Sequence, residues 1–215
     1  MTRYGMAIDL NICIGCNACT MACKAEHATP AGIFWSKVLE KEVGKFPAAR
    51  RVFLPVLCNH CKHPICEEVC PTGATSKRAD GIVLIDYDLC IGCRSCMEAC
   101  PYGPRAFYEG DGAYYAGGRT PYEEAKQDFS EGVVMKCNFC VDRVDQGLEP
   151  ACVQTCPTEC RVFGDLDDPQ SKVAHLIAEK KARPLLPEKG LEPLRQCFSQ
   201  KPYFPYFTPQ PECPS

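Results

Sequence analysis

The sequence predicts an α+β fold of two cysteine-rich modules, with insertions and an extended C-terminal arm. The first observation behind this is that sixteen of the nineteen cysteines fall into four groups of four. The second is an internal repeat at an offset of 77 residues. The third is the compact connector between the second and third groups, which contains one short strand.

The first and third groups share the spacing C-x2-C-x2-C-x3-C, which holds [4Fe–4S] clusters in bacterial ferredoxins. One tight turn can present two or three thiolates to the iron corners of a cubane, and Gly15 and Gly92 lie where that turn must curl. In two-cluster ferredoxins the fourth cysteine, one helical turn further on, ligates the other cluster. These two groups are Cys13, Cys16, Cys19 and Cys23, and Cys90, Cys93, Cys96 and Cys100.

The second and fourth groups differ from this pattern only in the length of the middle gap. Their spacings are C-x2-C-x4-C-x3-C and C-x2-C-x11-C-x3-C. Cysteines this close together cannot reach good disulfide geometry with one another, and zinc sites normally use two separated pairs. The sequence therefore predicts four [4Fe–4S] clusters. These groups are Cys58, Cys61, Cys66 and Cys70, and Cys137, Cys140, Cys152 and Cys156.

The internal repeat extends beyond the cysteines. At the offset of 77 residues, DLNICIGCNACTMAC overlays DYDLCIGCRSCMEAC. The second and fourth groups also match, and they align Asn59 with Asn138 and Thr72 with Thr158. Because cluster binding alone does not require these additional matches, we infer duplication of a unit with two groups.

The connector between Cys70 and Cys90 suggests how the groups pair. It is short, with a turn at Asp80-Gly81 followed by a strand over residues 82–85, as inside one bacterial two-cluster ferredoxin. Groups two and three are thus expected to form an inner ferredoxin-like module, residues 58–105. Groups one and four would form an outer module, residues 1–57 and 129–183. Tandem pairing, of one with two and three with four, remains the alternative.

We call the pairing of group two with three and of group one with four the crossed pairing. It assigns three ligands of each cluster to one group and the fourth ligand to the partner group. We call the resulting sets the first, second, third and fourth sites, after the group that supplies three ligands. The first site is Cys13, Cys16, Cys19 and Cys156, and the second is Cys58, Cys61, Cys66 and Cys100. The third site is Cys90, Cys93, Cys96 and Cys70, and the fourth is Cys137, Cys140, Cys152 and Cys23.

Several segments and residues fall outside these sites. Residues 106–128 are expected to be an insertion loop, and residues 184–215 a proline- and aromatic-rich arm that lies along a partner. An amphipathic helix near residue 170 is expected to bury Val173, Leu176 and Ile177. Cys160 aligns with Ala74 in the repeat and is expected to be a small buried residue. Cys197 and Cys213 are expected to be free thiols, with a disulfide between them as the alternative. His60 and His63 are expected not to be ligands, because the thiolate count is already full.

Composition limits the classes of function. The formal charge of −3 becomes more negative when thiolates and clusters are counted, which argues against nucleic acid as a partner. No stretch approaches the roughly 20 apolar residues of a membrane span, and the N-terminus lacks the apolar region of a signal peptide. The sequence also contains no nucleophile, acid–base pair or flavin motif that suggests a catalytic site on this chain.

Residues 4–181 resemble a known family, the four-cluster subunits of molybdenum or tungsten bis-pterin oxidoreductases such as dimethyl sulfoxide, polysulfide, thiosulfate and arsenate reductases. The resemblance rests on YGMAIDLNICIGCNACTMACKAEH, GIFWSKV, CNHCKHPICEEVCPTGA, CIGCRSCMEACPYGPRAF and KCNFCVDRVDQGLEPACVQTCPTECRVFGDLDDPQSKV. Some relatives replace one cysteine and carry a [3Fe–4S] cluster. No cysteine is replaced here, although Cys160 stands where the family pattern has alanine.

The resemblance implies a relay of single electrons between a molybdopterin catalytic subunit and a quinol-reacting membrane subunit, a cytochrome or another redox carrier. It also implies a prokaryotic protein held at a membrane through its partners, either periplasmic by co-export with the catalytic subunit or cytoplasmic. The alternatives are a freestanding polyferredoxin that shuttles electrons by diffusion, and the iron–sulfur subunit of a formate dehydrogenase or hydrogenase complex.

Overall fold

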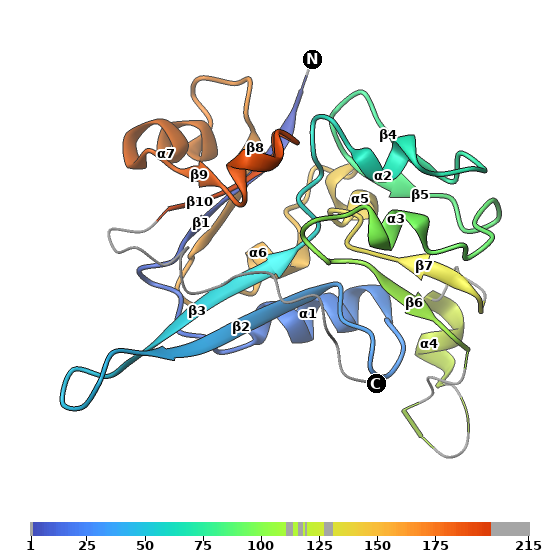
Figure 1. Cartoon of the computed structure of the whole chain (residues 1–215), viewed down its shortest axis with the longest axis horizontal. Coiled ribbons are helices and arrows are strands. Elements are labelled where there is room, and N and C mark those ends of the chain that lie inside the picture. Colours follow the sequence, from blue (N-terminus) through green and yellow to red (C-terminus); the bar gives the residue numbers. More distant parts are fainter. Residues whose placement is uncertain (1, 111–113, 116–117, 119, 127–130, 199–215) are drawn as a thin grey trace.

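The computed structural model describes residues 2–110, 114–115, 118, 120–126 and 131–198. The described part mixes short helices with four small sheets, in agreement with the expected α+β class. In Figure 1 the four-stranded sheet and α7 (Lys172–Lys180) lie at one end of the molecule. Helices α2 (Ile65–Glu68) and α3 (Ser95–Glu98) lie at the other end.

The four-stranded sheet has the strand order β8-β1-β10-β9, so the N-terminal strand is central. Its strands are β1 (Tyr4–Asp9), β8 (Arg161–Asp165), β9 (Arg183–Pro184) and β10 (Arg195–Phe198). Strand β1 pairs antiparallel with β8 and parallel with β10. This sheet joins the first residues of the chain to the segment that follows the fourth cysteine group.

Helix α7 covers this sheet with the apolar face that the sequence predicted. The side chain of Ser171 caps the helix by accepting a hydrogen bond from the Ala174 amide at 3.2 Å. Val173 is fully buried and packs with Ala7 of β1, and Leu176 and Ile177 lie against the same small core. The expectation for this face is confirmed.

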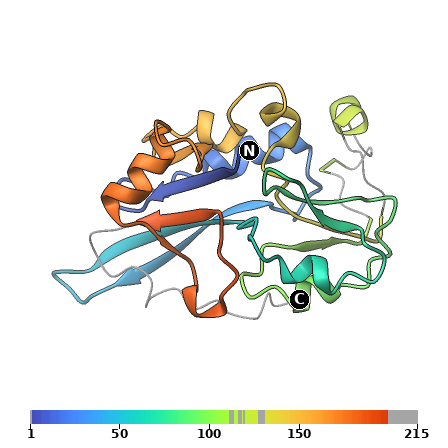
Figure 2. The same ribbon diagram turned by 90° about the horizontal axis from the view of Figure 1, so that it is seen from above.

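Three hairpins make up the remaining sheets. The longest, β2 (Ser36–Val43) with β3 (Arg50–Leu57), projects from the body of the molecule in both Figure 1 and Figure 2. Strand β5 (Val83–Ile85) is the strand predicted in the connector, and it pairs with β4 (Thr75–Lys77). Strand β6 (Ala106–Tyr108) pairs with β7 (Val133–Met135).

Short helices carry many of the cysteines and pack in pairs. Helix α1 (Ala18–His27) contains Cys19 and Cys23 and packs against α6 (Ala151–Gln154), which contains Cys152. Helix α2 contains Cys66 and packs against α3, which contains Cys96. Group one therefore lies beside group four, and group two beside group three. Helix α5 (Val141–Val144) directly follows Cys140.

The C-terminal segment departs from the expected arm. Residues 184–198 form β9, a 3-10 turn (Pro187–Lys189) and β10, and they join the four-stranded sheet instead of extending away from it. Leu194 and Cys197 are buried, because β10 lies beside β1 in the core. The many prolines of this segment conceal the strand in the sequence. The rest of the predicted arm, including Cys213, lies outside the described residues.

The predicted insertion loop also contains regular structure where it is described. It begins with β6 and includes α4 (Pro121–Lys126). The Tyr114 hydroxyl donates a hydrogen bond to the Thr29 carbonyl at 3.2 Å, and the Tyr122 hydroxyl donates to the Ala25 carbonyl. These contacts satisfy carbonyl groups at the C-terminal end of α1. The insertion is thus held against its own chain.

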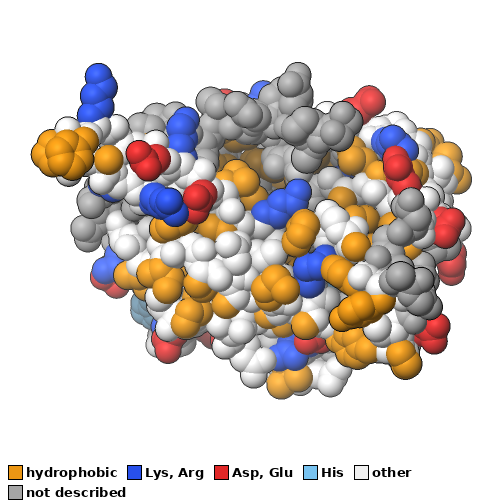
Figure 3. All heavy atoms as spheres, turned by 90° about the horizontal axis from the view of Figure 1, so that it is seen from below, with side chains coloured by type: hydrophobic (Ala, Val, Ile, Leu, Met, Phe, Trp, Pro, Cys, Tyr) orange, Lys and Arg blue, Asp and Glu red, His pale blue; other side chains and the backbone are white. Residues whose placement is uncertain are grey.

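Viewed from below, the surface shows several separate groups of hydrophobic side chains with lysine and arginine side chains between them (Figure 3). Among the large hydrophobic residues, Phe46 stands out, because this aromatic side chain in the turn of the β2–β3 hairpin is 94% exposed.

Candidate iron–sulfur centres

The turns of the first and third groups have matching backbone conformations. Gly15 and Gly92 have φ values of 69° and 66°, and Asn17 and Arg94, two residues later, also have positive φ. A Cβ atom on Gly92 would lie 2.0 Å from the Gly132 carbonyl oxygen, and one on Gly15 would lie 2.3 Å from the Phe53 ring. Glycine is therefore required at both positions for steric as well as conformational reasons.

The second and fourth groups make their turns without glycine. His60 and Phe139, at equivalent places of the repeat, have φ values of 43° and 62°. Their rings contact each other, with centroids 4.4 Å apart in an edge-to-face arrangement. Because both are almost fully buried, this aromatic pair holds the two turns together in the core.

Four thiols of the predicted first site line one small cavity: Cys13, Cys16, Cys19 and Cys156. Cys160 and Arg161 line the same cavity. The Cys160 Sγ lies 3.5 Å from the Cys156 Sγ, and a hydrogen bond from Cys160 lowers the pKa of the Cys13 thiol to about 6. The cavity thus brings together cysteines from the first and fourth groups.

The four thiols of the predicted third site line a second small cavity: Cys70, Cys90, Cys93 and Cys96. The Thr75 amide donates a hydrogen bond to the Cys70 Sγ at 3.5 Å, and the Thr72 hydroxyl lies 3.8 Å from the same sulfur. The Thr158 hydroxyl lies at the same distance, 3.8 Å, from the Cys156 Sγ. The threonine match in the repeat thus corresponds to a shared contact with sulfur.

The thiols of the predicted second site influence one another electrostatically. Burial raises the pKa of Cys61 to about 12, and the thiolates of Cys58, Cys100 and Cys66 act in the same direction. Burial also raises the pKa of Cys100 to about 11, with Cys58 and Cys66 again acting in the same direction. Cys100 belongs to group three, so this set again joins two groups.

The predicted fourth site is the most buried of the four. All of its cysteines are buried: Cys23, Cys137, Cys140 and Cys152. Burial raises the pKa of Cys23 well above its usual value, and the thiolates of Cys137, Cys152 and Cys140 add to the rise. Burial likewise raises the pKa of Cys137 to about 12.

Electrostatic neighbours also link one set to the next. The thiolate of Cys19 in the first set raises the pKa of Cys152 in the fourth. Cys58 in the second set raises the pKa of Cys137 in the fourth. Cys66 in the second set raises the pKa of Cys96 in the third. These interactions link the first set to the fourth, the fourth to the second, and the second to the third.

Buried cations lie between these sets, and two of them, Arg105 and Arg161, were not predicted from the sequence. Arg161 is 2% exposed, and its Nη2 donates a hydrogen bond to the Cys19 Sγ at 3.1 Å. Arg105 is 7% exposed and Lys136 is 2% exposed. The only signal in the sequence is that Arg105 and Arg161 each follow the last cysteine of a group by five residues. That spacing alone does not indicate which thiols the two guanidinium groups reach.

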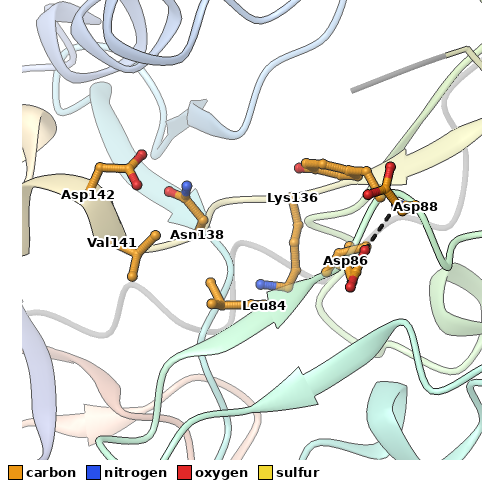
Figure 4. Close-up of a pocket in the computed structure, with 9 residues that line it drawn as sticks. Leu84, Asp86, Asp88, Lys136, Asn138, Val141 and Asp142 are labelled. Carbon is orange, nitrogen blue, oxygen red and sulfur yellow. Dashed lines mark hydrogen bonds between the residues drawn. The ribbon is translucent and has the colours of Figure 1, made fainter. Parts of the chain in front are cut away.

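Lys136 lies beside a shallow pocket formed by β5, the loop after it and α5 (Figure 4). Its amine donates hydrogen bonds to the Val83 carbonyl and, at 3.0 Å, to the Cys137 carbonyl. Burial lowers the pKa of Lys136, and the Cys58 thiolate opposes that shift. Asp86 and Asp88 also line the pocket.

His60 and His63 behave as structural residues. The Val83 amide donates a hydrogen bond to the His60 Nδ1 at 3.0 Å, and burial lowers the pKa of His60 well below its usual value. His63 is exposed and lies 3.5 Å from the Glu192 carboxylate. A different histidine, His27, lies near a thiol, with its Nε2 3.2 Å from the Cys140 Sγ. Cys197 is a free thiol, as expected.

The chemistry of these thiols fits an iron–sulfur core. Thiolates that face one another in the interior repel, and bound iron would offset the repulsion because its positive charge stabilises the deprotonated thiols that coordinate it. Within the described residues, no three His, Cys, Asp or Glu side chains meet closely enough to hold a single metal ion. In the first and third sets, four thiols instead line one shared cavity, an arrangement that suits coordination of one core by four thiolates.

Two family matches describe the chain as a 4Fe–4S dicluster protein. One 4Fe–4S dicluster domain family matches residues 49–117 and 111–166, and a second matches residues 12–74. The matches cover all four cysteine groups. The chain carries two ferredoxin-like dicluster domains and four [4Fe–4S] clusters.

The chain is also similar to named proteins over most of its length. It is 42% identical to the arsenate respiratory reductase iron–sulfur subunit of Shewanella sp. strain ANA-3, over 89% of this chain and 94% of the relative. It is 43% identical to a selenate reductase subunit of Mesobacillus selenatarsenatis, over 89% and 70%. It is 38% identical to a sulfite dehydrogenase subunit of Allochromatium vinosum, over 90% and 81%.

No helix among the described residues is long and apolar enough to cross a membrane. The cysteine arrangement, the dicluster matches and the similarity to arsenate and selenate reductase subunits agree with one another. The chain belongs to the family of four-[4Fe–4S] electron-transfer subunits of molybdopterin oxidoreductases, the group that includes the dimethyl sulfoxide and arsenate reductases.

Proposed function

We propose that the four crossed thiol sets are the ligand sets of the four clusters, and that they form one electron path in the order first, fourth, second, third. When bound, each cluster accepts and releases one electron at a time. The cysteines hold the clusters in this order, and the core buries all four cysteines of the fourth set, which lies inside the path. The path would join a molybdopterin catalytic subunit to a quinol-reacting membrane subunit or another redox carrier.

The exposure of the cysteines is the observation that carries this proposal. Of the sixteen cysteines in the four sets, only Cys16 and Cys93 are exposed. Cys16 belongs to the first set and Cys93 to the third, which are the two ends of the proposed order. The fourth set, inside the path, is buried throughout. Electrons can therefore enter and leave at two separate places.

The surface beside both ends is apolar. Ile14 next to the first set is 58% exposed, and Ile91, its equivalent in the repeat, is 67% exposed. Ile12 and Leu89, also equivalent in the repeat, are 44% and 50% exposed. Apolar surface around an exposed ligand supports two docking places, one for each partner. A freely diffusing shuttle needs only one.

Two modules follow from the same proposal. The outer module would hold the first and fourth sites. The packing of α1 against α6 and the pairing of β1 with β8 support this module. The inner module would hold the second and third sites, and the packing of α2 against α3 supports this module. Because β10 extends the sheet of the outer module, we place the outer boundary at about residue 198 and not at 183.

A pair of double variants tests the ligand sets. Under crossed pairing Cys70 and Cys90 bind the same cluster, so Cys70→Ala with Cys90→Ala removes one cluster and leaves about twelve of about sixteen irons. Under tandem pairing the same variant damages two clusters. Cys90→Ala with Cys93→Ala is the matched control, since it damages one cluster in either arrangement.

Iron analysis and electron paramagnetic resonance (EPR) of the reduced protein, purified with its partners, provide the measurement. Equal iron loss in the two double variants, with three unchanged cluster signals in each, is expected. Two altered signals in the Cys70/Cys90 variant alone would reject the crossed sets.

A further inference from the structure

Each proposed module contains one buried arginine between its two thiol sets. Arg161 lies between the first and fourth sets, and Arg105 lies between the second and third. Their placement is similar, since each follows the last cysteine of its group by five residues. Neither residue has a carboxylate partner among the described ion pairs. The negative groups near them are thiolates.

Arg161 reaches both sets of the outer module. Its Nη2 donates hydrogen bonds to the Cys19 Sγ at 3.1 Å and to the Ser36 Oγ at 3.3 Å. Burial opposes its positive charge, but the thiolates of Cys152 and Cys19 outweigh that effect and raise the pKa of Arg161. Its Nη1 is buried and has no hydrogen-bond partner in the described part of the chain.

Arg105 has the same features in the inner module. Its Nη1 lies 3.5 Å from the Thr75 hydroxyl, and its buried Nη2 has no hydrogen-bond partner among the described residues. Burial opposes its charge, while the thiolates of Cys66, Cys96 and Cys58 raise its pKa. Cys66 and Cys58 belong to the second set and Cys96 to the third.

Unpaired donor groups in the interior indicate a partner that the protein chain does not supply. A buried guanidinium costs free energy unless its charge and its N–H groups are satisfied. Arginine stays protonated at all accessible pH values, so each site between two sets carries a fixed positive charge. Sulfur atoms with negative charge on both sides are the acceptors that such a group would satisfy.

We propose that Arg161 and Arg105 act as fixed-charge tuning residues, each raising the reduction potentials of the two clusters on either side of it. This inference rests on the proposed ligand sets. Reduction adds one electron to a cluster and its four thiolates, and no bond is broken and no proton is transferred to or from the arginine. A nearby positive charge stabilises the more negative, reduced form. Because each arginine acts on both neighbours, it raises their potentials together.

Two charge-removing variants test the proposal: Arg161→Gln and Arg105→Gln, each purified in the full complex. Redox titration followed by EPR gives the midpoint potentials of the four clusters. Arg161→Gln is expected to lower two of the four midpoint potentials by ~59 mV each. For a one-electron couple this shift is a tenfold decrease in the equilibrium constant for reduction. Arg105→Gln is expected to lower the other two.

Arg51→Gln is the control for loss of one positive charge at the surface, because the Arg51 side chain is 65% exposed and water screens it. It is expected to leave all four potentials unchanged. Lysine variants at 161 and 105 retain the charge, and they are expected to restore most of the lowered potentials.

The outcomes separate this proposal from the ligand assignment. Unchanged potentials in both glutamine variants with full iron, or an equal shift of all four, would overturn the tuning role and leave the ligand sets intact. If a glutamine variant fails to retain iron, its lysine variant decides the question, because the shorter side chain moves the charge away from the thiols. A smaller decrease in the midpoint potentials of the same two clusters in the lysine variant then supports the proposal. Unchanged potentials in that variant reject it.

Discussion

Cys160 shows how a residue outside the motif can contribute to a site. From the sequence we expected only a small buried residue there, since Ala74 occupies the equivalent position in the repeat. Cys160 is indeed buried, at 3% exposure, but it also lines the cavity of the first set and contacts the Cys156 sulfur. Its thiol is thus placed within hydrogen-bonding distance of a thiol of the proposed first set.

The substitution Cys160→Ala tests that placement. Iron content is expected to stay unchanged, because Cys160 would not be a ligand. The potential of one cluster is expected to fall slightly, since a hydrogen bond to its thiolates is lost. Cys160→Ser, which keeps a donor, serves as the control in a redox titration. Loss of about four irons in the alanine variant would identify Cys160 as a ligand.

Whether the role of a single residue could be predicted depended on how far apart in the sequence its partners lie. The sixteen cysteines could be found because each of the four groups repeats nearly the same local spacing. Arg161 contacts Cys19, a residue 142 positions away, and no local pattern encodes that contact. His27 and Cys140 present the same difficulty, at a separation of 113 positions.

Among the elements, the turn at Gly92 is the one most sensitive to substitution. We expect Gly92→Ala to cost the third cluster, because the new methyl group would overlap the Gly132 carbonyl oxygen. Gly73→Ala is a matched control, since Gly73 also has positive φ but a methyl group there would have no atoms within 4 Å. The control is expected to cost about 1 kcal/mol of stability from conformational strain alone.

Iron analysis and thermal unfolding of the two glycine variants distinguish steric overlap from strain. Similar losses of iron in both variants would contradict the steric explanation.

Strand β10 is the element that could not be predicted from the sequence. Prolines on both sides conceal it, and its partner β1 lies near the opposite end of the chain. Arg195 in β10 is buried, and it donates hydrogen bonds to the Asn59 Oδ1 at 2.7 Å and to the Pro55 carbonyl at 2.6 Å. The strand therefore ties the four-stranded sheet to β3 and to the second cysteine group.

Truncation of the chain measures the contribution of that strand. Removal of all residues after 183 is expected to prevent stable assembly, because buried acceptors and core positions beside β1 lose their partners. Removal of residues after 198 retains every described contact of β10 and is expected to leave the chain folded. Circular dichroism and iron content report the difference. Equal stability of both truncated chains would contradict this role.

At the scale of the whole molecule, the principal core is continuous with the cluster sites. Buried cysteines from groups one, two and four belong to the same core as Met6, Leu54 and Met135. Duplication and crossed pairing could be inferred from the repeat and the connector, because both are properties of the sequence order. The order that we propose for the sites could not, because it depends on electrostatic interactions between residues of different modules, such as Cys58 and Cys137.

The exposure of Cys16 and Cys93 also sets an order of decay in air. Oxidants reach an exposed sulfur sooner than a buried one, so iron is expected to leave the first and third sites before the buried fourth site. Timed exposure to air, with iron release and cluster signals followed together, measures this order; early loss of the fourth site would contradict it. A chain exposed to air in this way would retain iron in its interior yet no longer transfer electrons between its partners, since the clusters at both ends of the path would be lost.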